Sequence, residues 1–281
     1  MGVKAERNSA TGENVPCPRD RNLTEEVKYG PYVLRTYRYP LPEGCLRISK
    51  NKKLVFSLDG LDFKIGKNFV GDPGIPVGTD LTGAGKPNAI VSEWSGGAHC
   101  CFTIHVFELG DRFKEIARIE AQHSDTAKFV DLNRDGSYEF EGYDFAFAYW
   151  RASFSYSPAP RIVLKFRDGK FHLAWDLMRR PELTSQEFLL LVRSIQSDGE
   201  WTDISPANCD MDCGVPVALW KTMLDLIYTD HPNIAWQLFD LSWKKGRVGK
   251  SKFASDFCSQ LKASKYWQDL RPEVGACPPR S

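Results

Sequence analysis

Residues 161–175 read RIVLKFRDGKFHLAW, and this stretch carries the clearest fold signal in the chain. Two runs rich in branched and aromatic residues flank the dipeptide Asp168-Gly169. A two-residue hairpin turn needs positive φ at both central positions, and Asp-Gly tolerates that conformation. The stretch therefore predicts a β-hairpin with strands over 161–167 and 170–175.

The same pattern of strands and turns extends toward the N-terminus as far as Cys45. Short runs of Val, Ile, Phe, Tyr and Trp are separated by Gly, Asp, Asn and Pro, which is typical of strands joined by turns. The other predicted strands span 45–49, 53–58, 88–94, 101–108, 113–121, 127–131 and 138–149. Residues 1–43 are polar and interrupted by proline, so we expect a mobile arm there and a β domain over 44–178.

After the hairpin, the spacing of apolar residues changes from two to about three and a half, which indicates helices. Thr184 and Glu187 have the spacing of a capping box at a helix start. Pro216 and Pro232 each suit the first turn of a helix. We therefore expect an α+β protein, in which an antiparallel β region is followed by a helical subdomain over 182–281.

Length and composition limit the possible classes of protein. A chain of 281 residues can bury a sizeable core without metal ions or cross-links. Its 37 basic and 36 acidic residues give a net charge of +1, which excludes a nucleic-acid binder that works by bulk positive charge. A hydrophobic content of 42% excludes intrinsic disorder, and no uncharged apolar stretch approaches the roughly 20 residues of a membrane span. We expect a globular protein that recognises its partner locally.

Residues 131–139, DLNRDGSYE, form the sharpest candidate binding site. Oxygen-bearing side chains stand at the first, third, fifth and ninth positions (Asp131, Asn133, Asp135 and Glu139), and Gly136 permits a sharp turn. A hard cation such as Ca²⁺ prefers six to eight oxygen ligands, which a short loop of this kind can supply. The alternative is an acidic, solvated turn without a metal ion. The flanking residues predict strands, so this is not an EF-hand, which needs helices on both sides.

A degraded copy of this loop occurs earlier in the chain. Residues 80–88, DLTGAGKPN, share Asp, Leu and Gly with residues 131–139 at a period of 131 minus 80, or 51 residues. The copy has Thr82 and Ala84 where the later loop has Asn133 and Asp135. We therefore expect the copy to be a turn that binds no metal.

The later loop between predicted strands, with its degraded copy, resembles the VCBS or FG-GAP type repeats of bacterial exported proteins over residues 77–150. In that family the loops bind calcium and hold propeller blades together. The 51-residue period is about the length of a propeller blade, and the β region over 45–176 holds only two or three units of that length. Closed propellers take at least four blades, so we expect propeller-blade-like sheets without closure. The resemblance also implies Ca²⁺ ligation by Asp131, Asn133, Asp135, the Ser137 carbonyl and Glu139. The family usually has Asp at the ninth position, where this chain has Glu139.

Cysteine usage bears on the compartment. An even number of cysteines, several in loop-like or terminal segments, favours disulfides and a periplasmic or secreted protein, against reduced thiols in the cytosol. The first 18 residues lack the apolar segment of a signal peptide, so an exported protein would begin here after cleavage. The eight are Cys17, Cys45, Cys100, Cys101, Cys209, Cys213, Cys258 and Cys277, and we expect disulfides within the last four.

Two classes of function remain open on the sequence. The preferred one is a calcium-stabilised binding or scaffolding module with a protein or glycan partner and no catalytic activity. The rival is a thiol-redox or copper- or zinc-dependent enzyme, or a metal carrier, that uses His99-Cys100-Cys101. Neighbouring side chains on a strand face opposite ways, so the two thiols should not enter one site. We expect Cys100 to be buried beside Phe102, Ile104 and Val106 in a structural role, with Cys101 on the other face or disulfide-bonded elsewhere. Neither HExxH nor GxSxG occurs, and the scattered histidines define no triad.

Overall fold

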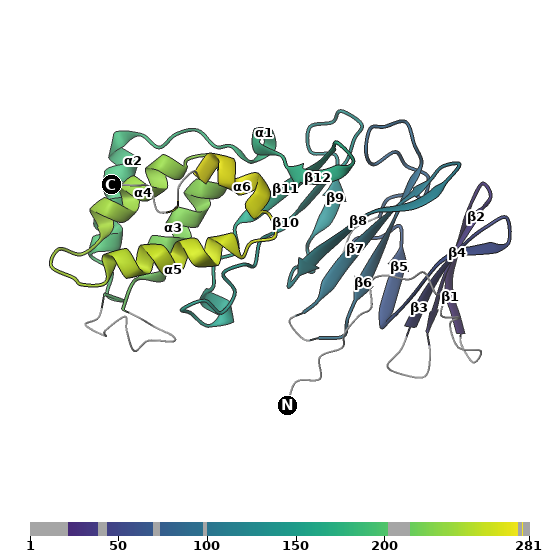
Figure 1. Cartoon of the computed structure of the whole chain (residues 1–281), viewed down its shortest axis with the longest axis horizontal. Coiled ribbons are helices and arrows are strands. Elements are labelled where there is room, and N and C mark those ends of the chain that lie inside the picture. The colour runs from purple at the N-terminus through teal and green to yellow at the C-terminus, as the bar shows by residue number, and fades with distance from the viewer. Residues whose placement is uncertain are drawn as a thin grey trace. The chain divides into compact units, whose positions relative to one another are not determined.

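A computed structural model describes residues 22–38, 44–69, 74–97, 100–201, 214–274 and 277. The described chain is α+β, with three four-stranded antiparallel sheets followed by helices (Figure 1). The strands in these ranges form no closed barrel or propeller. None of the described helices is both long and apolar enough to cross a membrane.

The chain divides into two compact units. The first unit comprises Met1–Thr79 and Lys86–Glu120, and the second comprises Asp80–Gly85 and Ala121–Ser281. The second unit therefore groups the third sheet with the helices, whereas the sequence divided the chain between 178 and 182.

The first sheet shows that the expected mobile arm is wrong from residue 22 onward. Its strands follow one another in chain order, as β1 (Asn22–Tyr29), β2 (Tyr32–Arg38), β3 (Gly44–Lys50) and β4 (Lys53–Gly60). Strand β1 is an edge strand with mostly exposed side chains, so its polar sequence resembles that of an arm. Residues 1–21 and 39–43, also assigned to the arm, lie outside the described residues.

The second sheet has the order β5 (Asp62–Ile65), β6 (Asn88–Trp94), β7 (Phe102–Leu109) and β8 (Phe113–Gln122). Three of these strands were predicted to within two residues, and the four-residue β5 was missed. One face of this sheet packs against the first sheet. Their shared core is formed by Tyr32, Leu34, Leu46 and Ile48 from the first sheet with Phe63, Ile65, Val91 and Phe107 from the second.

A buried histidine lies on the core face of the second sheet. His105 is 1% exposed, and its ring lies between two carboxylates, with Nε2 3.0 Å from Glu93 and Nδ1 2.8 Å from Glu115. Burial alone would lower the pKa of His105, but the hydrogen bonds and charges of Glu115 and Glu93 outweigh burial and raise it above 6.5. A protonated ring donates from both nitrogens, which suits two carboxylate acceptors.

The third sheet has the order β12 (Lys170–Leu173), β11 (Arg161–Arg167), β10 (Glu139–Tyr143) and β9 (Lys128–Val130). The predicted hairpin is confirmed, because Arg167 pairs with Lys170 around Asp168 and Gly169, which have φ of 50° and 80°. Its second strand ends at Leu173, two residues earlier than predicted.

The strand expected over 138–149 ends at Tyr143. The next residue, Asp144, is buried and turns the chain by accepting the Ala146 N–H at 2.9 Å. Its Oδ2 also accepts the hydroxyls of Tyr228 and Ser264, each at 2.5 Å. Burial, assisted by the Asp144 charge, raises the pKa of Tyr228 well above its ordinary value, so Tyr228 stays protonated as the donor.

Helices fill the C-terminal part of the chain, as expected. They are α1 (Trp175–Met178), α2 (Ser185–Gln196), α3 (Val217–Tyr228), α4 (Pro232–Ser242), α5 (Lys250–Lys262) and α6 (Trp267–Val274). The capping box of Thr184 and Glu187 is confirmed, and Pro232 occupies the first turn of α4. Sequence analysis missed α6, which is tied to β12 because Asp269 contacts His172 Nδ1 at 2.9 Å and accepts the Leu173 N–H at 3.0 Å.

Every cysteine among the described residues belongs to a disulfide. Cys258 on α5 is bonded to Cys277 with a Cα–Cα distance of 5.6 Å, which is one of the pairings that the sequence left open. Cys100 is bonded to its neighbour Cys101, and Cys45 is also disulfide-bonded. Cys17, Cys209 and Cys213 lie outside the described residues.

We expect the melting temperature to fall as the pH rises through the raised pKa of His105. A group whose pKa is higher in the folded state than in the unfolded state stabilises the protein fully at a pH below the unfolded pKa. This stabilisation is lost as the pH rises through the folded pKa. The Glu115→Gln substitution removes one of the two carboxylate charges beside His105 and so lowers the pKa of His105. The fall in melting temperature should therefore occur at lower pH. Titration of the His105 ring by NMR, with melting curves from about pH 6 to about pH 9, measures both effects. Equal titration midpoints in the two proteins would contradict this account.

Removal of the Cys258–Cys277 bond should destabilise the protein. The bond closes a loop with a sequence separation of 19, and cross-links of about this span contribute about 3 kcal/mol. Denaturant unfolding of a Cys258→Ala, Cys277→Ala variant measures the loss, and the single Cys277→Ala variant is the control that keeps Cys258. The assignment fails if non-reducing peptide mapping recovers both residues as free thiols.

Candidate functional site

The Asp131 loop, residues 131–139, connects β9 to β10. The Asp131 carboxylate accepts the backbone N–H groups of Asp135 and Gly136, both at 3.1 Å. Arg134 and Gly136 adopt left-handed backbone conformations, with φ of 61° and 88°. A residue without Cβ adopts this conformation at little cost, which explains the glycine at the sixth position.

The Asp80 loop, residues 80–88, repeats this geometry. The Asp80 carboxylate accepts the N–H groups of Ala84 at 3.2 Å and Gly85 at 2.6 Å, which are also the fifth and sixth positions. Its fourth and sixth positions, Gly83 and Gly85, have φ of 69° and 70°. The similarity seen in the sequence is therefore a similarity of backbone conformation. The two loops also meet, because Tyr138 donates its N–H to the Leu81 carbonyl at 3.0 Å.

Hydrogen bonds link several of the predicted ligands of the Asp131 loop to one another. Asn133 Nδ2 donates to Asp135 Oδ2 at 2.8 Å, and the Ser137 N–H and hydroxyl donate to Asp135 Oδ1 at 2.8 and 2.5 Å. The Glu139 carboxylate is fully buried, and its Oε2 accepts the Leu132 N–H at 3.0 Å. Its other oxygen, Oε1, has no hydrogen-bond partner in the part of the chain that the structure describes.

A lysine that sequence analysis missed contacts this loop. Lys165 Nζ lies 2.9 Å from Asp135 Oδ2 and 3.5 Å from Glu139 Oε1. The hydrogen bond to Ser137, with further support from Lys165, holds the pKa of Asp135 well below its ordinary value. The hydrogen bond to Asp135 raises the pKa of Lys165. Strands β10 and β11 pair with Phe140 opposite Leu164, which places Lys165 opposite Glu139. The contact between Lys165 and Glu139 depends on this register, which the sequence does not predict.

The described residues contain no group of three or more His, Cys, Asp or Glu side chains that could hold a metal ion. Amide and backbone carbonyl oxygens do not belong to such a group, although Ca²⁺ accepts them as ligands. In the Asp131 loop, Asn133 and Ser137 contribute oxygens of these two kinds.

The cysteine pair differs from the sequence prediction. Cys100 was expected to be buried on a strand, but β7 begins only at Phe102, and the alternation of side chains does not apply before it. Cys100 is half-buried and Cys101 is exposed, and the two form a disulfide. The pair is anchored to Ser95, whose hydroxyl accepts the Cys101 N–H at 2.8 Å. The third residue of the motif, His99, lies outside the described residues.

We compared the chain with protein-family models, curated proteins and solved structures. None of these comparisons found a match.

Loss of the Lys165 ammonium should destabilise the protein when calcium is absent. In Lys165→Met the buried Glu139 Oε1 loses the only cation that the described residues bring near it, and an unsatisfied buried polar group costs about 1–3 kcal/mol, with more for a charged one. The control is Lys170→Met, which changes an exposed lysine on β12 by the same substitution. Denaturant unfolding in the presence of a chelator compares the two variants. Equal stabilities would show that Glu139 does not depend on Lys165.

Proposed function

We propose that this protein is a calcium-stabilised binding or scaffolding module that works outside the cytoplasm and recognises a protein or a glycan. The observation that carries the proposal is the buried Glu139 Oε1, which belongs to a loop rich in oxygen ligands and has no hydrogen-bond partner among the described residues, where the Lys165 ammonium is an ion-pair contact at 3.5 Å. A buried carboxylate oxygen without a partner is costly, and a bound cation would remove that cost.

The chemistry of the loop fits calcium. Its side chains present carboxylate and amide oxygens, which are the hard ligands that Ca²⁺ prefers. Each carboxylate oxygen has more than one lone pair, so Asp131 can hold the loop amides and still bind a cation. The residues that would hold Ca²⁺ are Asp131, Asn133, Asp135, Glu139 and the carbonyl of Ser137. The bound ion would supply structural support, and no reaction is assigned to it.

The arrangement of the sheets supports the blade-like interpretation. Each sheet is a meander of four strands in chain order, as in a propeller blade. The Asp80 loop precedes β6, the second strand of its sheet, and the Asp131 loop precedes β10, the second strand of the next. The two loops therefore occupy equivalent places in successive sheets, which is expected when a blade is the repeating element.

The disulfides support the proposed location. The described cysteines are all bonded, and disulfides persist in oxidising compartments such as the periplasm or the cell exterior. A chain of this size can bury a large core, so these bonds are not needed merely to compensate for a small one.

A thiol-redox enzyme or metal carrier at Cys100-Cys101 is the second candidate. The exposure of Cys101 favours it, because a thiolate must reach a disulfide in order to exchange with it. In that reaction an external dithiol would be oxidised while the Cys100–Cys101 bond is reduced to two thiols. Copper or zinc binding would need those reduced thiolates. A Cys100→Ser, Cys101→Ser variant that loses dithiol oxidase activity or metal binding while remaining folded would favour this candidate.

Calcium should raise the melting temperature of the full chain, since a ligand held only by the folded state stabilises it by mass action. At 100 times the dissociation constant the gain is about 2.7 kcal/mol, which amounts to several degrees. Asp135→Asn should reduce the effect, because it replaces a charged carboxylate ligand by a neutral amide oxygen, while keeping an acceptor for Ser137. Asp125→Asn, at an exposed acidic residue outside the loop, makes the same charge change and should leave the effect intact.

The Lys165→Met variant provides a second test of calcium binding, because the Lys165 ammonium and a calcium ion would compete for Asp135 and Glu139. Removing the ammonium should make the calcium-dependent rise in melting temperature larger. The proposal is overturned if neither calcium nor a chelator changes the melting temperature of the wild-type protein and elemental analysis finds no bound metal.

A further inference from the structure

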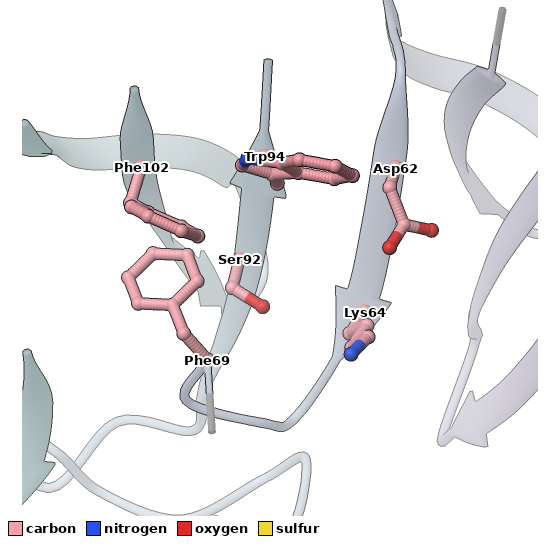
Figure 2. A pocket seen from close by; sticks show the side chains of 6 residues that line it. All are labelled: Asp62, Lys64, Phe69, Ser92, Trp94 and Phe102. Carbon is pink, nitrogen blue, oxygen red and sulfur yellow. The ribbon is translucent and has the colours of Figure 1, made fainter. Parts of the chain in front are cut away.

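The first unit contains a pocket of about 240 Å³ on its second sheet (Figure 2). Three strands and one loop residue line it. The lining residues are Asp62 and Lys64 on β5, Ser92 and Trp94 on β6, Phe102 on β7, and Phe69. The cavity is smaller than the roughly 300–1,000 Å³ of pockets for drug-sized ligands, so it fits a single ring and not a long chain.

Strand register places five of these residues on one face of the sheet. Trp94 pairs with Asp62 on one side and with Phe102 on the other, so these three form one row across three strands. Ser92 pairs with Lys64 in the next row on the same face. The intervening residues face the opposite way, and Phe63 among them belongs to the core. The pocket is therefore built on the rigid backbone of a sheet.

Aromatic rings supply the apolar wall of the pocket. The rings of Phe69 and Phe102 pack with centroids 4.7 Å apart at an interplanar angle of 60°. Trp94 is 36% exposed, which is high for a tryptophan on a strand, and its Nε1 donates to the Gly97 carbonyl at 3.3 Å. That hydrogen bond helps fix the indole and leaves an apolar ring face for a ligand.

Polar groups lie across the pocket from the two phenylalanines. Figure 2 shows the Ser92 hydroxyl between the phenylalanine rings and the side chains of Asp62 and Lys64. The Asp62 carboxylate is oriented by Arg38, whose Nη2 lies 2.5 Å from Oδ1, and none of the described residues donates a hydrogen bond to Oδ2. Arg38 and Lys64 together outweigh Asp62 by one positive charge, which disfavours a cationic ligand although aromatic rings can bind cations.

We propose that this pocket binds one sugar residue of a glycan. The C–H groups on one face of a sugar ring pack on the electron-rich face of an aromatic ring. Its hydroxyls would donate to Asp62 Oδ2 and accept from Lys64, and the Ser92 hydroxyl can do either. The surplus positive charge favours a sugar that carries a carboxylate, such as a uronic acid. Of the two partners proposed above, a protein or a glycan, the pocket favours the glycan, and this assignment rests on the proposed binding function.

The test screens the full chain against an array of neutral and uronic-acid-bearing oligosaccharides and titrates the best binder by calorimetry. Trp94→Ala should weaken binding at least tenfold, which corresponds to about 1.4 kcal/mol, and Trp94→Phe should weaken it less. Lys64→Gln, at an exposed position, should weaken binding of the acidic oligosaccharide more than binding of its neutral counterpart. Tyr149→Ala removes an exposed aromatic ring in the second unit and should leave binding unchanged.

The inference is overturned if no oligosaccharide binds. Binding that is unaffected by both Lys64→Gln and Trp94→Ala, in proteins with an unchanged melting temperature, would also overturn it. Its failure is distinguishable from failure of the calcium proposal, because the pocket belongs to the first unit and the Asp131 loop to the second. Melting temperature with and without calcium tests the loop alone, and sugar titration tests the pocket alone.

Discussion

The hydrogen bonds from loop amides to one aspartate carboxylate are the constraint on which the candidate calcium site depends. In the Asp131 loop two backbone N–H groups converge on that carboxylate, and two residues adopt positive φ so that they can do so. Both amides are exposed and could bond to water instead, so the carboxylate favours this turn conformation rather than removing a cost of burial. The loop that it organises ends at β10, whose first residue, Glu139, is buried.

The Asp80 and Asp131 loops share the geometry in which an aspartate carboxylate accepts loop amides, but they carry different side chains. In the Asp80 loop the third and fifth positions are Thr82 and Ala84, so Asp80 is the loop's one carboxylate and its oxygens accept the loop's own donors. In the Asp131 loop the corresponding positions carry Asn133 and Asp135, and Glu139 adds a buried charge. Such a concentration of acceptors needs a cation, which Lys165 supplies in part and calcium would supply more fully.

Sequence reasoning succeeded where the signal is local and failed where it depends on strand pairing. The Asp168-Gly169 turn and the Thr184 capping box were predictable because neighbouring residues determine them. Strand β1 was missed because an edge strand keeps polar side chains, and the four-residue β5 is too short to show a period. Lys165 gave no signal, since its contact with Glu139 exists only in the register of β10 and β11. The pocket residues come from segments that only the sheet brings together.

The two faces of the second sheet have different roles that are physically coupled. On β6, Glu93 points to the core face and contacts His105 of β7, whereas Ser92 and Trp94 on either side of it point to the pocket. A one-residue slip between β6 and β7 would break the buried contact of His105 and also turn Trp94 away from the pocket. Because an unpaired buried charge is costly, the Glu93–His105 contact fixes the register, and the register places Trp94 beside Phe102. A polar pair on the core face can in this way position the side chains that line a pocket on the opposite face of the sheet.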